Sequence, residues 1–392
     1  MASQKINRNE RYMLKGRLRR EGFDHWRLVT SGTSSVTGEE RVFFIEFYVV
    51  NPSISPDECI LGFKNRSQIS EEDLHSALAG TLSARDVEAE KYVQPSFVMV
   101  KAGIFKQNGK QMNNYFPSKF ISLGGAELLF KVGSNESNTC VLTTSSTYGS
   151  VSVSDSDIAE HPELLCQSGS MSWNLHYEKE ITFPDYRNSQ ICWAVPGAKT
   201  SVEGKIVFDG EEFVVTPKKS NGYFEVYWGK THLDQYYHMS GSRMFSLNTG
   251  KPLENSCFTV KGTCDGVVAV MVSVEGRKYC FSVDQAKKLE LTYEFTEIPD
   301  EDEDDVKFHW SVSISDKKYV VDIDGFCNDK AMFLRDYECP EGKRKVLRVA
   351  GAGTGTGELK VFKKIKKALE QIEYARIENM VCEYGGIEFP EI

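Results

Sequence analysis

The sequence has little that would place the protein in a membrane or outside the cell. Its richest apolar stretch, residues 42–50, is interrupted by Glu46. It is therefore too short for a membrane span, which needs about 18 uninterrupted apolar residues. The first residues also lack the apolar core of a signal peptide. We therefore expect a cytoplasmic protein without a transmembrane segment.

Clustered cysteines are missing as well. The ten cysteines are scattered along the chain, with no Cys-x-x-Cys pair and no short Cys/His cluster. Zinc ligands need such spacings, and disulfides need an oxidising compartment, so neither is expected. We predict free thiols that behave as small buried hydrophobes, and we expect neither a metal nor a redox cofactor.

An excess of positive charge is absent too. The net charge is −9, which argues against a nucleic-acid partner held by phosphate neutralisation. The acidic run at residues 297–305 (EIPDEDEDD) has neither the alternating ligands nor the glycine of a calcium loop. A solvated loop is the expected structure there.

The familiar nucleotide and hydrolase motifs are not found. The chain has no Gly-x-Ser-x-Gly elbow and no His-Glu-x-x-His pair. The glycine-rich run at residues 351–357 (GAGTGTG) has Thr356 where a dinucleotide-binding loop needs glycine, and no Lys-Ser/Thr pair follows it. We interpret this run as a flexible hairpin loop.

Short strand-like segments make up most of the chain. Residues 41–50 are rich in β-branched and aromatic side chains, and residues 204–216 resemble two strands around an Asp209-Gly210 turn. Similar segments continue to residue 362. The pattern predicts an all-β protein of two antiparallel barrel or sandwich domains, residues 1–229 and 230–392, with a few short helices.

Two segments have helical signals. Ser70 and the acids after it could begin a helix, and residues 363–383 have apolar side chains near helical spacing. The second segment predicts an amphipathic helix that closes one end of a barrel. Because it is basic, such a helix could also make peripheral contact with a membrane surface.

Aromatic, acidic and histidine side chains concentrate between residues 171 and 245. In a β-rich protein such a group can line a barrel mouth or an interdomain cleft, although aromatic residues in strands also fill cores. The group contains Trp173, His176, Trp193, Tyr223, Glu225, Tyr227, Trp228, His232, Tyr236, Tyr237 and His238.

Several segments in and around this region resemble the tocopherol cyclase family. They are residues 171–175 (MSWNL), 193–204 (WAVPGAKTSVEG), 209–212 (DGEE) and 222–229 (GYFEVYWG), with weaker likeness at residues 43–52 and 383–385. Where that family has Lys-Asn, this chain has Val226-Tyr227. The resemblance implies lipocalin-like β-barrel domains, an apolar isoprenoid or prenylquinol ligand, and kinship with carotenoid hydratases.

The implied reaction is cyclisation of a prenylated quinol after protonation of a double bond. It needs a carboxylic acid that stays protonated, which burial among apolar groups favours, and aromatic faces around the cation. Glu225 is the candidate acid, and His176 or His238 could accept the phenol proton. The candidate substrate-binding side chains are Trp173, Trp193, Tyr223, Tyr227 and Trp228.

Two other functions remain open. A lipocalin-like barrel can simply carry an apolar lipid, and a related enzyme could hydrate an isoprenoid double bond.

Strand alternation places Tyr223, Glu225 and Tyr227 on one face. Trp228 then lies on the opposite face unless a bulge intervenes.

Overall fold

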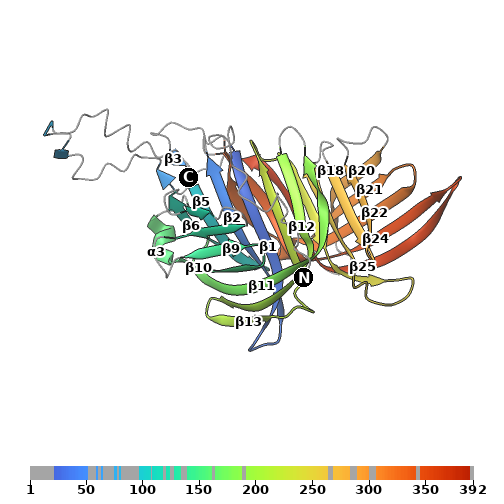
Figure 1. Ribbon diagram of the computed structural model, residues 1–392, viewed down its shortest axis with the longest axis horizontal. Helices are drawn as coiled ribbons and strands as arrows, with labels where there is room; N and C mark the ends of the chain where they lie inside the picture. The colour runs from blue at the N-terminus through green and yellow to red at the C-terminus, as the bar shows by residue number, and fades with distance from the viewer. Residues whose placement is uncertain are drawn as a thin grey trace.

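The computed structural model describes residues 22–51, 59–60, 63–64, 75–76, 79–80, 97–106, 108–117, 121–123, 128–133, 139–160, 164–187, 191–263, 268–282, 289–299, 306–340 and 345–388. Nearly all of them lie in strands of two large antiparallel sheets (Figure 1). The predicted all-β class with two antiparallel sheets is confirmed. No helix in these ranges is long and apolar enough to cross a membrane.

The first sheet contains twelve strands, all of them before residue 230. Its order is β6-β5-β2-β1-β13-β12-β11-β10-β9-β8-β7, and β14 pairs with both β1 and β12. The strands are β1 (Gly22–Ser34), β2 (Glu40–Asn51), β5 (Phe97–Phe105), β6 (Lys110–Pro117), β7 (Ile121–Leu123), β8 (Leu129–Val132), β9 (Cys140–Thr143), β10 (Ser146–Val153), β11 (Gly169–Arg187), β12 (Ile191–Phe208), β13 (Glu211–Val215) and β14 (Gly222–Gly229).

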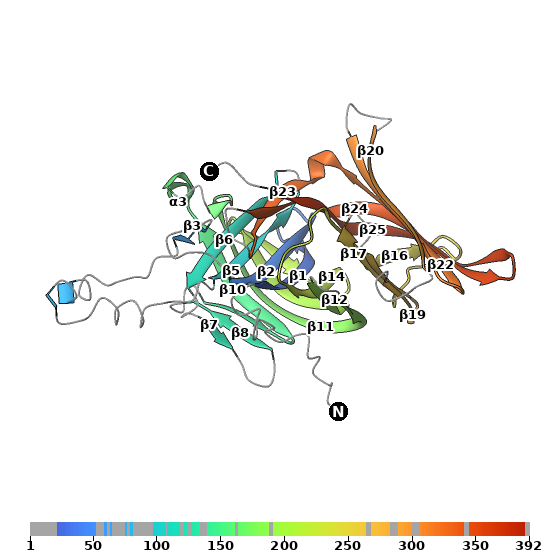
Figure 2. The same ribbon diagram turned by 90° about the horizontal axis from the view of Figure 1, so that it is seen from above.

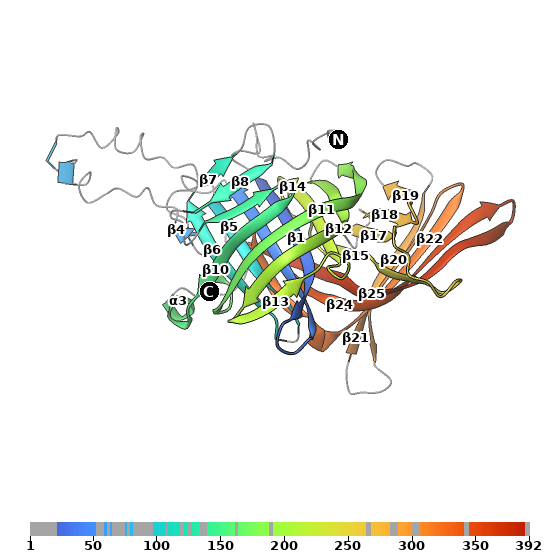
Figure 3. The same ribbon diagram turned by 60° about the horizontal axis from the view of Figure 1, so that its bottom comes forward.

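This sheet curls until β10 and β11 lie beside β6 (Figure 3). Its inner face is a filled core, because alternate residues of each strand point inward and are apolar. Trp26, Phe47, Phe130 and Trp173 are among them. Apart from the sheet stand a short ribbon of β3 (Cys59–Ile60) and β4 (Phe63–Lys64) and the six-residue helix α3 (Asp155–Glu160).

The second sheet begins at residue 236. Its order is β19-β18-β17-β15-β25-β24-β22-β21-β20, while β16 pairs with β25 and β23 pairs with β24. The strands are β15 (Tyr236–Gly241), β16 (Arg243–Ser246), β17 (Cys257–Thr263), β18 (Val268–Val274), β19 (Arg277–Ser282), β20 (Glu290–Pro299), β21 (Val306–Ser315), β22 (Tyr319–Asn328), β23 (Phe333–Glu338), β24 (Val346–Ile365) and β25 (Ala368–Glu388). The change of sheet falls between β14 and β15, and the domain limits at residue 229 stay a prediction.

The two sheets pack against each other side by side (Figure 2). A continuous cluster of buried side chains joins them, with Phe44 and Tyr48 from β2, Met271 from β18 and Val349 from β24. Burying such residues contributes roughly 25 cal/mol per Å² of apolar surface, so the contact is a major source of stability. It also makes the outer face of β1, β2 and β14 an interior surface.

The helix predicted for residues 363–383 is wrong. The segment forms the turn and second strand of the long β24–β25 hairpin, in which Glu373, Ala375 and Ile377 are buried alternately. The apolar residues near helical spacing therefore lie in a sheet of period two, because pairing with β24 overrides the local pattern. Of the helix predicted after Ser70, the structure describes residues 75–76, which are helical, and a turn at residues 79–80. Residues 300–305 of the acidic run lie outside the described residues.

The glycine-rich run is also not a loop. Residues 351–357 lie inside β24, where glycine permits close approach of neighbouring chains. A Cβ atom at Gly357 would come within 2.2 Å of the Asp324 carbonyl oxygen, and one at Gly353 within 2.7 Å of Val42 in the first sheet. The glycines thus let β24 lie against both β22 and β2.

The cysteines agree with the prediction of free thiols wherever the structure describes their side chains. The eight are Cys140, Cys166, Cys192, Cys257, Cys280, Cys327, Cys339 and Cys382. Burial raises the pKa of the Cys140 thiol to about 11, so it is inert as a nucleophile. The side chains of Cys59 and Cys264 lie outside the described residues.

Candidate functional site

Strand β14 is buried on both faces, and this places Glu225 between the sheets. Phe224, Val226 and Trp228 point into the core of the first sheet. Tyr223 and Tyr227 belong to the apolar cluster between the sheets. Strand alternation puts Glu225 on their side, where its exposed fraction is only 1%.

Glu225 is surrounded by donors and cations. Trp193 Nε1 donates to its carboxylate at 2.6 Å and the Tyr223 hydroxyl at 2.9 Å. Lys261 Nζ lies 2.9 Å from one carboxylate oxygen, and Arg27 Nη2 lies 2.8 Å from the other. Four side chains from four strands therefore meet on one carboxylate.

The ionic contacts continue across the space between the sheets. Arg27 Nη1 donates to Glu383 at 2.6 Å, and Arg335 contacts both Glu383 and Glu46, the latter at 3.1 Å. The Tyr236 hydroxyl donates to Glu383 at 3.1 Å. We call this group the buried polar cluster; it consists of Arg27, Glu46, Tyr223, Glu225, Tyr236, His238, Lys261, Arg335, Tyr337 and Glu383.

The charges of the buried polar cluster balance, because three cations face three carboxylates. Burial by itself would raise the pKa of Glu225, but the opposing attraction of Arg27 and Lys261 holds it well below its usual value. The pKa of Glu383 is lowered in the same way by Arg27 and Arg335. Both carboxyl groups are therefore ionised.

The role of proton donor expected for Glu225 stays a prediction. A proton donor must keep its proton near neutral pH, whereas Arg27 and Lys261 lower the pKa of Glu225 and favour its ionised form. The aromatic faces expected to stabilise a carbocation surround the Lys261 ammonium instead: its Nζ lies 4.6 Å from the ring centroid of Tyr227 and 5.3 Å from that of Trp193. Lys261 belongs to β17 of the second sheet, and its ammonium group is the cation that these rings surround.

His238 differs from the ion-paired members of the buried polar cluster in its charge and in its hydrogen bonding. Burial lowers its pKa to about 3, so the imidazole is neutral at physiological pH. Neither ring nitrogen has a hydrogen-bond partner among the described residues, although the residue is fully buried. Its ring centroid lies 5.6 Å from that of Tyr223 and 6.4 Å from that of Trp193. A buried polar group without a partner is rare and calls for an explanation.

The free space beside the cluster is small. A cavity of about 20 Å³ is lined by His25, Arg27, Tyr227, His232, Tyr236, Tyr337, Leu347, Val349 and Glu383. A single water molecule needs roughly 10–15 Å³ of such space. The cavity therefore accommodates about one water, and a prenylated quinol does not fit without movement of the sheets.

The remaining candidate residues lie elsewhere. Trp173 is buried in the core of the first sheet, where its Nε1 donates to Thr147 at 2.9 Å. His176 lies on the outer face, opposite Ser146. Both line a hollow of about 780 Å³ on β10 and β11, away from Glu225. Trp228 points into the core, as strand alternation indicated.

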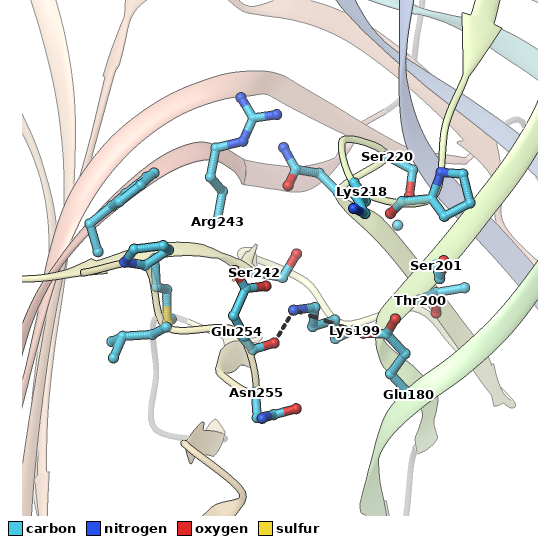
Figure 4. Close-up of a pocket in the computed structure, with 17 residues that line it drawn as sticks. Glu180, Lys199, Thr200, Ser201, Lys218, Ser220, Ser242, Arg243, Glu254 and Asn255 are labelled. Carbon is cyan, nitrogen blue, oxygen red and sulfur yellow. Dashed lines mark hydrogen bonds and ion pairs between the residues drawn. The ribbon is translucent and has the colours of Figure 1, made fainter.

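A cleft of about 540 Å³ lies between the sheets near one end of β12. Figure 4 shows polar side chains from both sheets around it. Lys199, Lys218 and Arg243 bring positive charge, while Met244, Phe245, Pro252 and Leu253 form an apolar side. Of these residues, Lys199 falls in a segment that resembles the tocopherol cyclase family.

The cations of this intersheet cleft differ in how firmly they are held. Arg243 makes two hydrogen bonds to Glu40 of the first sheet, at 2.8 and 2.9 Å. Lys199 Nζ donates to the Glu254 carbonyl oxygen and lies 3.8 Å from Glu180. Lys218 is exposed and has no ion-pair partner within the described ranges. Glu180 and Glu254 line the cleft as well, so the available positive charge is mainly that of Lys218.

No group of three or more His, Cys, Asp or Glu side chains able to hold a metal ion occurs within the described ranges.

No protein-family model and no curated protein matches the chain. Among solved structures it is similar to a protein assigned as AttH from Nitrosomonas europaea, with 9% identity over 97% of this chain and 98% of that one, and a TM-score of 0.43. It is also similar to kievitone hydratase from Nectria haematococca, with 10% identity over 92% and 88% and a TM-score of 0.36. These scores are too low to support a functional argument, and membership of the tocopherol cyclase family stays a prediction.

Proposed function

We propose that the protein binds an amphipathic small molecule, with an acidic head and an apolar body, in the intersheet cleft. The cleft's volume of about 540 Å³ is the observation on which this proposal rests. Pockets for small molecules usually measure roughly 300–1,000 Å³, whereas the cavity at the buried polar cluster holds about one water. Binding at the cleft therefore needs no rearrangement of the sheets.

The acidic head follows from the charges on the cleft wall. Arg243 is neutralised by Glu40, and Lys199 has a distant acidic neighbour, but Lys218 is free of ion pairs in the described part of the chain. A ligand carboxylate or phosphate placed between Lys199 and Lys218 would gain charge-assisted hydrogen bonds. Ser201 lines the same wall and can add a hydroxyl donor.

The apolar body of the ligand is inferred from the apolar side chains on the opposite wall of the cleft. Phe245 and Pro252 come from β16 and the turn after it, and Met244 and Leu253 lie behind them. Covering this surface would remove apolar area from water. An isoprenoid or fatty acid has the required combination of an anionic head and an apolar chain, and the isoprenoid class agrees with the family resemblance.

Direct binding measurements test this proposal. Calorimetry with farnesoic acid and farnesol compares two ligands that share an isoprenoid hydrocarbon chain and differ in whether they carry an anionic head. We expect the acid to bind at least about tenfold more tightly, because hydrogen bonds to charged groups contribute about 1.5–3 kcal/mol. The double variant Lys199→Met/Lys218→Met should lose this preference.

A matched control is Lys205→Met, since Lys205 is exposed and pairs with Glu212 outside the cleft. It should bind both ligands like the unaltered protein. Equal affinity for acid and alcohol, or an unchanged preference in the double variant, would reject the cleft as the binding site.

A second candidate function is acid–base chemistry on a double bond at the buried polar cluster. The neutral imidazole of His238, which has no hydrogen-bond partner in the described part of the chain, favours it, because such a group can accept a phenol proton. Glu225 would act there as a carboxylate that orients neighbouring groups. This function requires the sheets to part, since the cavity is too small for the substrate.

Mass spectrometry of a prenylated hydroquinone after incubation separates the two candidates. A product of unchanged mass and altered retention indicates cyclisation, and a gain of one water indicates hydration. Unaltered compound supports binding alone. If turnover is found, Glu225→Gln should reduce it while ligand binding at the cleft persists.

A further inference from the structure

The β24–β25 hairpin extends beyond the rest of the second sheet. Neighbouring strand β22 begins at Tyr319, opposite Lys363, and the hairpin continues through the pairs Lys364–Leu369 and Ile365–Ala368. All side chains from residue 365 to residue 371 are exposed. Figures 1 and 2 show this tip projecting at one end of the molecule's long axis.

Lysines gather at this end, on a protein whose net charge is −9. The hairpin tip carries Lys363, Lys364, Lys366 and Lys367, and the adjacent turn carries Lys317 and Lys318. The backbone N–H of Lys364 donates to the carbonyl oxygen of Lys318 at 2.7 Å, which brings the two lysine groups together. We call these residues, with Ile365 and Leu369, the basic tip.

The acids near the basic tip, Asp316, Glu290 and Glu370, are fewer than its six lysines. Glu370 lies opposite Lys363 across the hairpin. Asp316 accepts the backbone N–H groups of Lys318 and Tyr319, each at 2.7 Å, and so serves to hold the turn. Glu290 lies 3.9 Å from Lys364, at the edge of ion-pair distance, and is largely exposed. The lysines therefore form a local positive field on an otherwise acidic protein.

Two features of the basic tip do not stabilise the folded protein. Ile365 is 42% exposed and Leu369 is 56% exposed, so two large apolar side chains face water at the end of a hairpin. Lys366 has a φ of 56°, a left-handed conformation that a hairpin turn normally gives to glycine or asparagine. Stability of the hairpin does not account for these residues.

We propose that the basic tip docks on an anionic lipid surface. Lysines next to exposed aliphatic side chains are the combination that peripheral membrane contacts use: the apolar groups enter the headgroup region and the ammonium groups lie near lipid phosphates. The negative charge of the whole protein disfavours a nucleic acid as the partner, since such partners require broad positive surfaces. The proposal does not depend on which ligand fills the intersheet cleft.

Vesicle co-sedimentation of the full chain tests the proposal. One set of vesicles is phosphatidylcholine alone, and the other is a two-to-one mixture of phosphatidylcholine and phosphatidylserine. We expect binding to the mixed vesicles only, and we expect it to weaken as salt is added. A heparin column run in parallel reports binding to a polyanion that has no apolar surface.

Two variants separate charge from apolar insertion. Lys366→Glu/Lys367→Glu should lower the partition coefficient on mixed vesicles about 30-fold or more, since each lysine near such a surface contributes about fivefold. Ile365→Ser/Leu369→Ser should lower it while leaving the salt dependence in place. The control Lys106→Glu/Lys230→Glu makes the same charge change at exposed sites outside the basic tip and should bind almost unchanged.

Equal binding to both vesicle types, or equal losses in the control and in Lys366→Glu/Lys367→Glu, would overturn the proposal. So would retention on heparin through the basic tip without any vesicle binding, because that would indicate a polyanionic macromolecule as the partner. Circular dichroism of each variant verifies that the sheets are intact.

Discussion

The buried polar cluster and the intersheet cleft both lie between the two sheets, and both combine acids with lysine or arginine. They differ in how completely their charges are enclosed and paired. Arg27 and Glu383 are almost fully buried and bound to each other, whereas Lys218 in the cleft is exposed. The free volumes are about 20 and 540 Å³. Enclosed charges hold the sheets together, and exposed charges remain available to a ligand.

Removing one ion from the buried polar cluster should have the largest effect on stability. Arg27→Met deprives Glu225 and Glu383 of a shared partner in a site that is almost fully buried. Breaking a buried pair in this way typically costs about 3–5 kcal/mol. Urea denaturation, followed by the intrinsic fluorescence of tryptophan, measures the loss in unfolding free energy. A loss below about 1 kcal/mol would mean that the cluster is not structural.

A smaller loss is expected from one neutral hydrogen-bond donor of the same cluster. The Tyr223 hydroxyl donates to Glu225 at 2.9 Å and lies 3.0 Å from the Thr259 hydroxyl. Tyr223→Phe keeps the ring and removes a bond to a charged group, so we expect about 1.5–3 kcal/mol of destabilisation. The exposed Tyr148 serves as a control, and Tyr148→Phe should leave the urea midpoint unchanged.

Acid should destabilise the folded protein in a defined pH range, through His238 of the buried polar cluster and through His232, which lines the small cavity beside it. Burial lowers the pKa of His232 and of His238 to about 3. In the unfolded chain each histidine takes up its proton near pH 6.5, so between pH 6.5 and 3 the unfolded state binds more protons. Stability therefore falls with decreasing pH, by about 1.4 kcal/mol per pH unit for each histidine.

The depressed pKa of Glu225 acts in the same direction. Its contribution is complete above the unfolded carboxyl pKa, near 4.3, and is lost as the pH falls toward the lower folded value. The variant His238→Leu should reduce the slope of unfolding free energy against pH by the share of one histidine. Urea denaturation from pH 7 to pH 5 measures this slope. His176→Gln, at an exposed position, should retain the full slope. An unchanged slope in His238→Leu contradicts the assignment.

The smallest effect is expected in the intersheet cleft. Arg243 and Glu40 are each about a quarter to a third exposed, although their two hydrogen bonds join the sheets. Exposed ion pairs contribute about 0–1 kcal/mol, so Arg243→Met should change stability by no more than that. If Arg243→Met lost as much unfolding free energy as Arg27→Met, the ion pair at the intersheet cleft would be as structural as the buried polar cluster, and the comparison would fail.

Alternation along β14 can be recognised in the amino-acid sequence. The order Tyr223, Glu225, Tyr227 predicts a shared face, and Tyr223 and Glu225 are hydrogen-bonded as that face requires. The charged partners of Glu225 were missed, because Lys261 and Arg27 come from distant strands. Lys261 is a lone charge inside an apolar strand segment, residues 257–263 (CFTVKGT), and that pattern could have indicated a buried ion pair.

The sequence by itself determined the all-β class, the run of strands and which face of β14 each side chain occupies, because these follow from local alternation. Only the tertiary structure decided the protonation of Glu225, since it depends on Arg27 and Lys261, which enter through pairing of distant strands. The same holds for residues 363–383, which became a strand because β24 offered them a partner. Contacts between residues far apart in sequence are not encoded in any local pattern, and they set both the charge of the site and the shape of the cleft.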